Sequence, residues 1–200
     1  MKILISAVGD TDPIRNFHDG ALLHIARKYR PDKIVLVFSD RTRDKKESIE
    51  KALHSIESSY LPEIVIHQPV ISNNDVYVFD TMFDQFSSII QEYYTKEDEF
   101  ILNLSSATPQ IKSSLFVINR LSGINVKAVQ VSSPANDSNA DIPHENVDDI
   151  DLLIDTNEDN VAEFIDRTLE DESEKFSHAL IKKTIRDFIQ RFDYKAALEL

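Results

Sequence analysis

The sequence predicts an α/β fold in which helices cover both faces of a mainly parallel, doubly wound sheet. Five short runs of β-type residues alternate with segments whose apolar residues recur at helical spacing. The run Lys33–Phe38 is almost continuously apolar, which is typical of a parallel strand buried on both sides. Because right-handed crossovers place helices on both faces of such a sheet, the alternation indicates a Rossmann-like architecture.

The predicted elements follow one another regularly. Strands are expected at Lys2–Val8, Lys33–Phe38, Glu63–His67, Phe100–Leu104 and Asn125–Val131. Helices are expected at Ile14–Tyr29, Ile49–Tyr60, Phe79–Tyr93 and Ile111–Leu121, because apolar residues three and four positions apart give each segment one apolar face. The fourth strand is expected to lie beside the first, where the sheet reverses its winding direction.

The alternation stops after the fifth strand. Ser132–His144 is rich in turn-forming residues and is predicted to be a long loop. A short strand is expected at Ile150–Ile154, a helix at Val161–Leu169 and a longer helix at Phe176–Phe192.

The organisation of the chain follows from these elements. Residues 1–150 are predicted to form one domain, and residues 151–200 an acidic linker with helices that lead to a further region. The chain ends in a helix-forming stretch without a cap, glycine or proline, so we interpret it as cut within a longer protein; a frayed natural terminus is the alternative.

Composition excludes several classes of site. The three glycines, Gly9, Gly20 and Gly123, form no glycine-rich phosphate loop and no serine-hydrolase elbow. The absence of cysteine excludes thiolate zinc sites and disulfides and fits a reducing compartment, so a cytoplasmic location is expected. No apolar run approaches the ~18 residues of a membrane span, and the first residues resemble a strand rather than a signal peptide.

The net charge of −13 is unevenly distributed. Residues 137–174 contain 15 of the 35 acidic residues and a single basic one, Arg167, whereas the preceding part of the chain is nearly neutral. Because duplex DNA is bound by neutralising many phosphates, DNA is not an expected partner. The acidic run is interpreted as a solvated connector.

Two strand-to-helix loops carry the candidate site. In each, a capping residue, Asp12 or Thr108, precedes a proline, Pro13 or Pro109, which suits the first position of a helix. Each loop is therefore predicted to place a helix N-terminus at the carboxyl edge of the sheet, where free amides can donate hydrogen bonds to an anion. Either loop alone is also an ordinary helix start; the two together at the switch point favour a site.

The residues around these loops suit a polar, phosphorylated ligand, because hydroxyls, amides and cations bind phosphate and base edges. The predicted ligand-binding residues are Ser6, Gly9, Asp10, Thr11, Asp12, Pro13, Ser39, Asp40, Arg41, Asn103, Ser105, Ser106, Ala107, Thr108, Gln110 and Lys112.

Histidine spacing predicts no metal site, and no metal or other cofactor is expected. The six histidines form no HExxH motif or paired-ligand spacing. His18 and His24 are expected on different faces of one helix, with His24 at the surface or at its boundary with the core.

The segments GDTDPI, SDRT and NLSSATPQIKSSL together resemble the CARF domain of CRISPR-associated type III, Csm-type, CARF–HEPN ribonucleases. The resemblance covers about residues 1–150, which it implies to be a ligand-sensing domain. Residues 157–200 are similar to the connector and the first effector helix. Ala107 departs from the glycine that the family carries before the threonine.

The resemblance implies a homodimer that binds one cyclic oligoadenylate across its two-fold axis, hexa-adenylate in preference to tetra-adenylate. It also implies allosteric activation of a C-terminal endoribonuclease specific for single-stranded RNA. The paired arginine and histidine of HEPN nucleases, four to six residues apart, do not occur in this chain. Thr108 matches the family's ring-cleaving threonine, although a helix-capping role is favoured.

Three alternatives remain open at this point. In the first, the chain is a stand-alone ring nuclease that cleaves the cyclic ligand. In the second, it is the sensor of a CARF transcriptional regulator, and in the third, an unrelated Rossmann-like enzyme that uses a nucleotide or methyl donor. The lack of a glycine fingerprint argues against the last of these.

Overall fold

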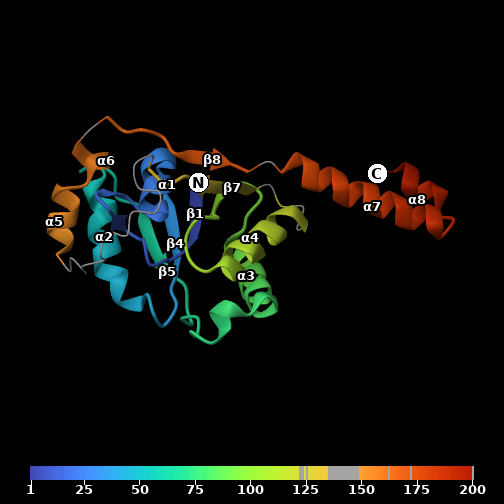
Figure 1. The fold of residues 1–200 in the computed structure, drawn as a ribbon, viewed down its shortest axis with the longest axis horizontal. Coiled ribbons are helices and arrows are strands. Elements are labelled where there is room, and N and C mark those ends of the chain that lie inside the picture. Colours follow the sequence, from blue (N-terminus) through green and yellow to red (C-terminus); the bar gives the residue numbers. More distant parts are fainter. Residues whose placement is uncertain (122–123, 125, 135–148, 162, 172, 200) are drawn as a thin grey trace. The chain divides into compact units, whose positions relative to one another are not determined.

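The computed structural model (Figure 1) describes residues 1–121, 124, 126–134, 149–161, 163–171 and 173–199. They form two compact units, Met1–Glu170 and Asp171–Leu200. None of the helices in these described ranges is long and apolar enough to cross a bilayer.

The first unit is built on a six-stranded sheet of order β5-β4-β1-β6-β7-β8. Its strands are β1 (Lys2–Ala7), β4 (Lys33–Val37), β5 (Glu63–Ile66), β6 (Glu99–Asn103), β7 (Val126–Val131) and β8 (Thr168–Glu170). All neighbours are parallel except β8, which runs antiparallel to β7. The five predicted strands are confirmed within about one residue, except that residue 125 lies outside the described residues. The predicted adjacency of the first and fourth strands, now β1 and β6, is also confirmed.

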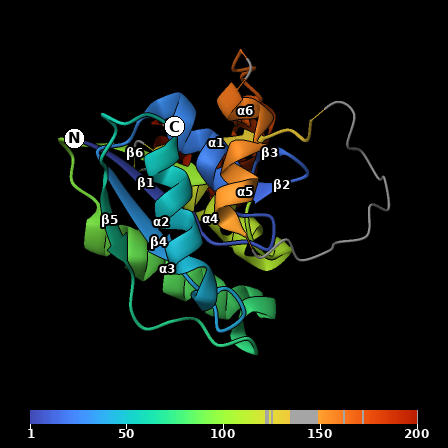
Figure 2. The same cartoon turned by 90° about the vertical axis from the view of Figure 1, so that its left-hand side faces the viewer.

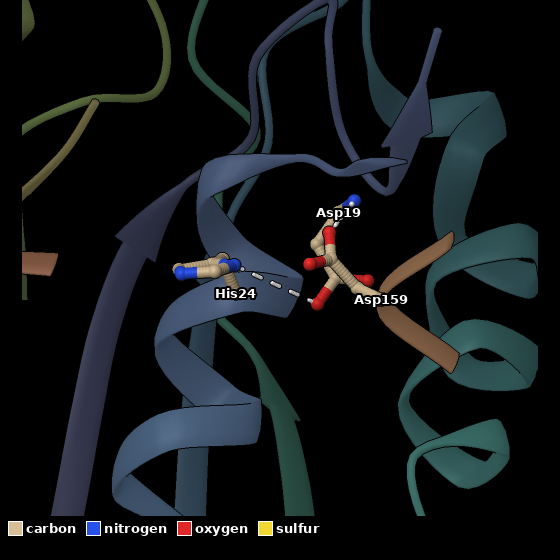
Figure 3. Close-up of side chains that lie close together, drawn as sticks. All are labelled: Asp19, His24 and Asp159. Atoms are coloured by element: carbon tan, nitrogen blue, oxygen red, sulfur yellow. Dashed lines mark hydrogen bonds and ion pairs between the residues drawn. The ribbon is translucent and has the colours of Figure 1, made fainter. Parts of the chain in front are cut away.

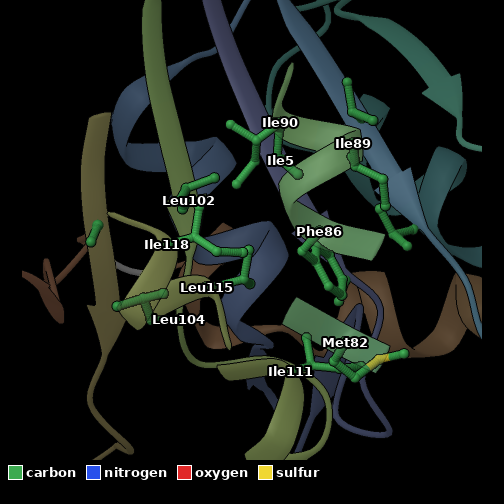
Figure 4. Close-up of a cluster of buried hydrophobic side chains, with 14 of the residues drawn as sticks. Ile5, Met82, Phe86, Ile89, Ile90, Leu102, Leu104, Ile111, Leu115 and Ile118 are labelled. Atoms are coloured by element: carbon green, nitrogen blue, oxygen red, sulfur yellow. The ribbon is translucent and has the colours of Figure 1, made fainter. Parts of the chain in front are cut away.

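Helices cover both faces of the sheet, so the predicted doubly wound α/β class is confirmed. They are α1 (Ala21–Tyr29), α2 (Lys46–Ser55), α3 (Phe79–Tyr93) and α4 (Pro109–Leu121), with single 3-10 turns at η1 (Arg43–Lys45) and η2 (Asp75–Tyr77). The helices α3 and α4 bury their apolar faces against one side of the sheet, and Phe86 and Leu115 in that layer are inaccessible to solvent (Figure 4). The helices α1 and α2 form the opposite layer.

The helix predicted from Ile14 does not begin there. A two-stranded hairpin, β2 (Ile14–Arg15) and β3 (His18–Asp19), precedes α1. Its turn residues Asn16 and Phe17 have positive φ values of 50° and 62°. A turn with φ positive at both central residues matches the twist of a hairpin and is incompatible with a helix. The apolar spacing from Ile14 therefore does not mark a helix, and α1 begins only at Ala21.

The region 150–170 also differs from its prediction. Ile150–Asp155 is a helix, α5, rather than a strand, because the Asp149 carboxylate caps it by accepting the amides of Asp151 and Leu152. A short helix, α6 (Glu158–Val161), follows beside β3, while α5 lies beside β2 (Figure 2). The predicted helix at Val161–Leu169 is wrong, since Val161 is the last residue of α6, residues 163–167 form no helix, and β8 begins at Thr168. Most of the predicted loop Ser132–His144 falls outside the described residues.

The second unit contains α7 (Glu174–Gln190) and α8 (Tyr194–Leu198). The predicted helix at Phe176–Phe192 is thus confirmed apart from its last two residues. The helix ends before Phe192, which has a positive φ of 61°. The Asp193 carboxylate then caps α8 by accepting the amide of Ala196.

Candidate functional site

The loops after β1 and β6 meet at the carboxyl edge of the sheet. A Cβ atom added at Gly9 would lie 2.7 Å from the backbone nitrogen of Ala107. Real Cβ atoms do not approach backbone so closely, so only glycine permits this contact between the loops. The two segments therefore share one location, as the strand order predicted.

The first loop is organised around a buried carboxylate, Asp12. Its Oδ2 accepts the amide of Gly9 at 2.9 Å, and its Oδ1 accepts the amide of Leu22 at 3.1 Å. Burial raises the pKa of the Asp12 carboxyl, and Ser106 from the second loop offsets part of this rise. Asp12 thus stabilises the N-terminus of α1 from ten residues away, and Pro13 is not the first residue of that helix as predicted.

The second loop begins α4 as the sequence predicts, with Pro109 as its first residue. The Thr108 hydroxyl accepts the amide of Ile111 at 3.4 Å and donates to the Val76 carbonyl at 2.7 Å. Thr108 is therefore a helix cap that also ties α4 to the segment before α3. Ala107 has a φ of 72°, the left-handed conformation in which glycine is favoured.

Several predicted ligand residues lie beneath the loops and shape them. Asn103 is fully buried, and its amide nitrogen donates to the hydroxyls of Ser6 at 2.9 Å and Ser106 at 2.8 Å. Its oxygen accepts the amides of Ser105 at 2.8 Å and Ser106 at 3.3 Å. The Ser105 hydroxyl accepts the amide of Val131. Asn103, Ser6 and Ser106 therefore serve as the scaffold of the two loops, and Asn103 has no group left to read a base edge.

Most of the other predicted residues are at least partly exposed to solvent. Asp10, Asp40 and Arg41 are exposed, whereas Thr11, Ser39, Ala107, Gln110 and Lys112 are half-buried. The Arg41 guanidinium forms an ion pair with Asp10 at 3.0 Å, which brings the loop after β4 to the loop after β1. The Gln110 side-chain oxygen is shielded from solvent and has no hydrogen-bond partner among the described residues. The amides of Asp10 and Thr11 likewise find no acceptor in the described part of the chain.

One residue that the sequence analysis missed, Lys45, reaches the first loop from η1. Its ammonium donates to the backbone carbonyls of Gly9 at 3.2 Å, Asp10 at 2.7 Å and Asp12 at 2.7 Å. No motif signals this role, because a lysine between a strand and a helix is ordinarily solvated.

A second buried polar cluster lies beside β3, where Asp19, His24 and Asp159 place their ligand-type atoms within 4.8 Å of one another (Figure 3). The prediction that His24 lies at the surface or its boundary is wrong, since His24 is fully buried, and His18 lies in β3 rather than on a helix.

This cluster does not fit a metal ion, because cations and amide donors already occupy its ligand atoms. Arg27 binds both Asp19 oxygens, at 2.7 and 3.0 Å. Arg167 donates to Asp159 at 3.2 Å from its guanidinium and to His24 Nε2 at 2.9 Å from its amide. The cluster instead joins the segment that leads to β8 to the start of α1.

The burial of His24 predicts a pH dependence of stability. Burial, followed by the neighbouring Arg167, lowers the pKa of His24 to about 4, from 6.5 in the unfolded chain. Between these values the unfolded chain binds a proton that the folded chain does not, so stability falls as the pH falls. The expected loss from this group approaches ~3 kcal/mol at pH 4.

Urea denaturation at pH 7 and pH 4.5 measures this loss. We expect His24→Gln, which retains an acceptor for the Arg167 amide, to lose less stability on acidification than the wild type. His54→Gln, at an exposed position, should lose as much as the wild type. An equal loss in all three proteins would contradict the assignment to His24.

The sequence of the chain is similar to a known protein family and to several known proteins. The family model of the Csm6 CARF domain matches residues 62–168. The chain is 68% identical over 200 residues to the CRISPR system endoribonuclease Csm6′ of Streptococcus thermophilus, and covers 52% of that protein. It is 51% identical over 197 residues to Csm6 of the same species, with 98% of the chain and 46% of the relative covered.

A solved structure agrees with the fold. Csm6 of Enterococcus italicus, bound to cyclic hexa-2′-fluoro-hexa-dAMP, superposes with a TM-score of 0.76 at 28% identity, covering 100% of this chain and 49% of that one. The chain thus spans about half the length of the proteins it matches.

Proposed function

Because the chain belongs to the Csm6 CARF-domain family, we propose that it is the sensor part of a CRISPR antiviral ribonuclease and binds a cyclic oligoadenylate. Residues 1–150 carry the sensing role in this proposal, and residues 151–200 lead toward an effector region. The activity belongs to that C-terminal region, an endoribonuclease specific for single-stranded RNA, which the bound ligand activates allosterically.

The observation that carries the proposal is the contact between the loops after β1 and β6 at Gly9 and Ala107. It brings the unpaired amides of Asp10 and Thr11 to the end of the sheet at which α4 begins. Backbone amides and a helix N-terminus bind phosphate without a glycine-rich loop. A cyclic oligonucleotide presents several phosphates to such a surface.

The symmetry of the ligand supports a homodimer. A ring with two-fold symmetry suits two identical patches related by a two-fold axis, so each protomer would bind half of the ring. Hexa-adenylate is favoured over tetra-adenylate, because the relative from Enterococcus italicus is bound to a six-membered ring.

Isothermal titration calorimetry with cyclic hexa-adenylate and cyclic tetra-adenylate tests the proposal. We expect one ring per two chains and tighter binding of the hexamer. Light scattering should give the mass of a dimer. Binding of neither ring would overturn the sensor function, and one ring per chain would overturn the shared site.

Cleavage of the ligand is the second function that the site raises. The Thr108 hydroxyl donates its proton to the Val76 carbonyl and caps α4, and both contacts favour a structural role. We therefore expect incubation with the cyclic ligand to yield no linear product on a chromatographic time course. Linear product that disappears in Thr108→Ala would instead support a ring nuclease.

A further inference from the structure

The ammonium of Lys45 lies against the backbone of the loop after β1, where it binds carbonyl oxygens as a metal cation would. Its ammonium carries three N–H groups, and three backbone carbonyls lie within 2.7–3.2 Å of it, those of Gly9, Asp10 and Asp12. All of its donors are therefore used by the protein. Lys45 has none left for a phosphate, although it lies at the proposed site.

The carbonyls that Lys45 binds determine where the next amides point. In a trans peptide the C=O and the following N–H point in opposite directions. The Gly9 carbonyl faces Lys45, so the amide of Asp10, in the same peptide unit, points away from Lys45. The Asp10 carbonyl also faces Lys45, so the amide of Thr11 points away from Lys45 as well. Neither of these two amides has an acceptor in the described part of the chain.

The charges around Lys45 suit this fixed position. Buried Asp12 and exposed Asp10 attract the ammonium, and burial nevertheless lowers the pKa of Lys45. Asp12 itself accepts the amides of Gly9 and Leu22, so the loop is held by a carboxylate and an ammonium together. Arg41, a nearby cation, is exposed and forms an ion pair with Asp10 at 3.0 Å.

We propose that Lys45 is a positioning residue for ligand binding: it holds the Gly9 and Asp10 carbonyls inward so that the Asp10 and Thr11 amides face an anionic phosphate. The inference rests on the proposed function. It adds a residue from the segment before α2 that does not touch the ligand.

Calorimetry of Lys45→Met with cyclic hexa-adenylate tests this role. Methionine keeps an unbranched side chain but donates no hydrogen bond, so we expect an affinity loss of ~10–100-fold, equivalent to one or two misdirected amides. Lys46→Met is the matched control, since Lys46 is exposed and pairs only weakly with Glu50 at 3.9 Å. It should bind as the wild type does.

Two further measurements separate positioning from a purely structural role. Lys45→Arg keeps the charge but has a planar donor group, so it should recover part of the lost affinity; it also carries the test if Lys45→Met does not fold. Ligand-induced protection of the Asp10 and Thr11 amides from hydrogen exchange should be present in the wild type and absent in Lys45→Met.

The outcomes distinguish the two proposals. Wild-type affinity in a folded Lys45→Met would overturn the positioning role and leave the sensor function standing. Failure of the wild type to bind either ring would overturn both.

Discussion

Replacing Asp19 with alanine is expected to lower the free energy of unfolding of the Met1–Glu170 unit by ~3–5 kcal/mol, the range for removing one partner of a buried ion pair. Asp19 is the only carboxylate that the described residues offer to Arg27, which binds it through Nε at 2.7 Å and Nη2 at 3.0 Å. Asn157 also donates to Asp19, at 2.7 Å. The substitution therefore removes the counter-charge of the buried Arg27 guanidinium, which keeps the Asn160 side-chain oxygen as an acceptor at 2.6 Å. It also leaves the Asn157 amide without its acceptor.

Chemical denaturation followed by circular dichroism measures this change. Asp151→Ala is the matched control, because Asp151 forms an exposed pair with Lys51 at 3.0 Å. Exposed pairs contribute ~0–1 kcal/mol, so the control should barely move the midpoint. Equal losses in the two variants would show that the cluster around Asp19 does not hold the unit together.

The same cluster explains where sequence-based prediction fails. The apolar spacing of Val161–Leu169 fits a helix, but Arg167 binds His24 and Asp159, and the segment is drawn out into β8. The contact between Arg167 and His24 joins residues 143 positions apart. Periodicity describes only neighbours along the chain and contains no information about such pairs.

The elements that could be predicted are those determined by residues close together in the sequence. The strand Lys33–Val37 and the helix Phe79–Tyr93 follow from the spacing of apolar residues, and α4 begins at Pro109 because proline suits the first helical turn. The adjacency of β1 and β6, which follows from crossover rules, was predictable as well.

The site itself was only partly predictable. Its location follows from the two loops, but burial divides the predicted residues into scaffold, such as Asn103, and exposed groups, such as Arg41. Asp12 was expected to cap a helix directly after it, and instead reaches Leu22 across a hairpin. That hairpin depends on two left-handed residues, which the helical spacing around them conceals.

Gly9→Ala is expected to reduce affinity for cyclic hexa-adenylate by ~10–100-fold, because losing one hydrogen bond to a charged phosphate costs ~1.5–3 kcal/mol. The new Cβ would lie 2.7 Å from the Ala107 nitrogen and 3.4 Å from its Cα, and neither backbone atom can move without its loop. The loops must therefore separate, and the Asp10 and Thr11 amides shift relative to the N-terminus of α4. Calorimetry measures the affinity, and a thermal melt measures the accompanying overpacking cost of ~1–3 kcal/mol.

Ala107→Gly is the control for this contact, since it removes a methyl group from the other residue of the pair, whereas Gly9→Ala adds one. Ala107 has a φ of 72°, and relief of this left-handed strain is worth up to ~1–2 kcal/mol before the entropy of glycine is counted. The control should therefore retain full affinity and at least wild-type stability. If Gly9→Ala also bound the ring with full affinity, the two loops would not need their close contact to hold the ligand. The binding surface would then lie elsewhere on the sheet edge.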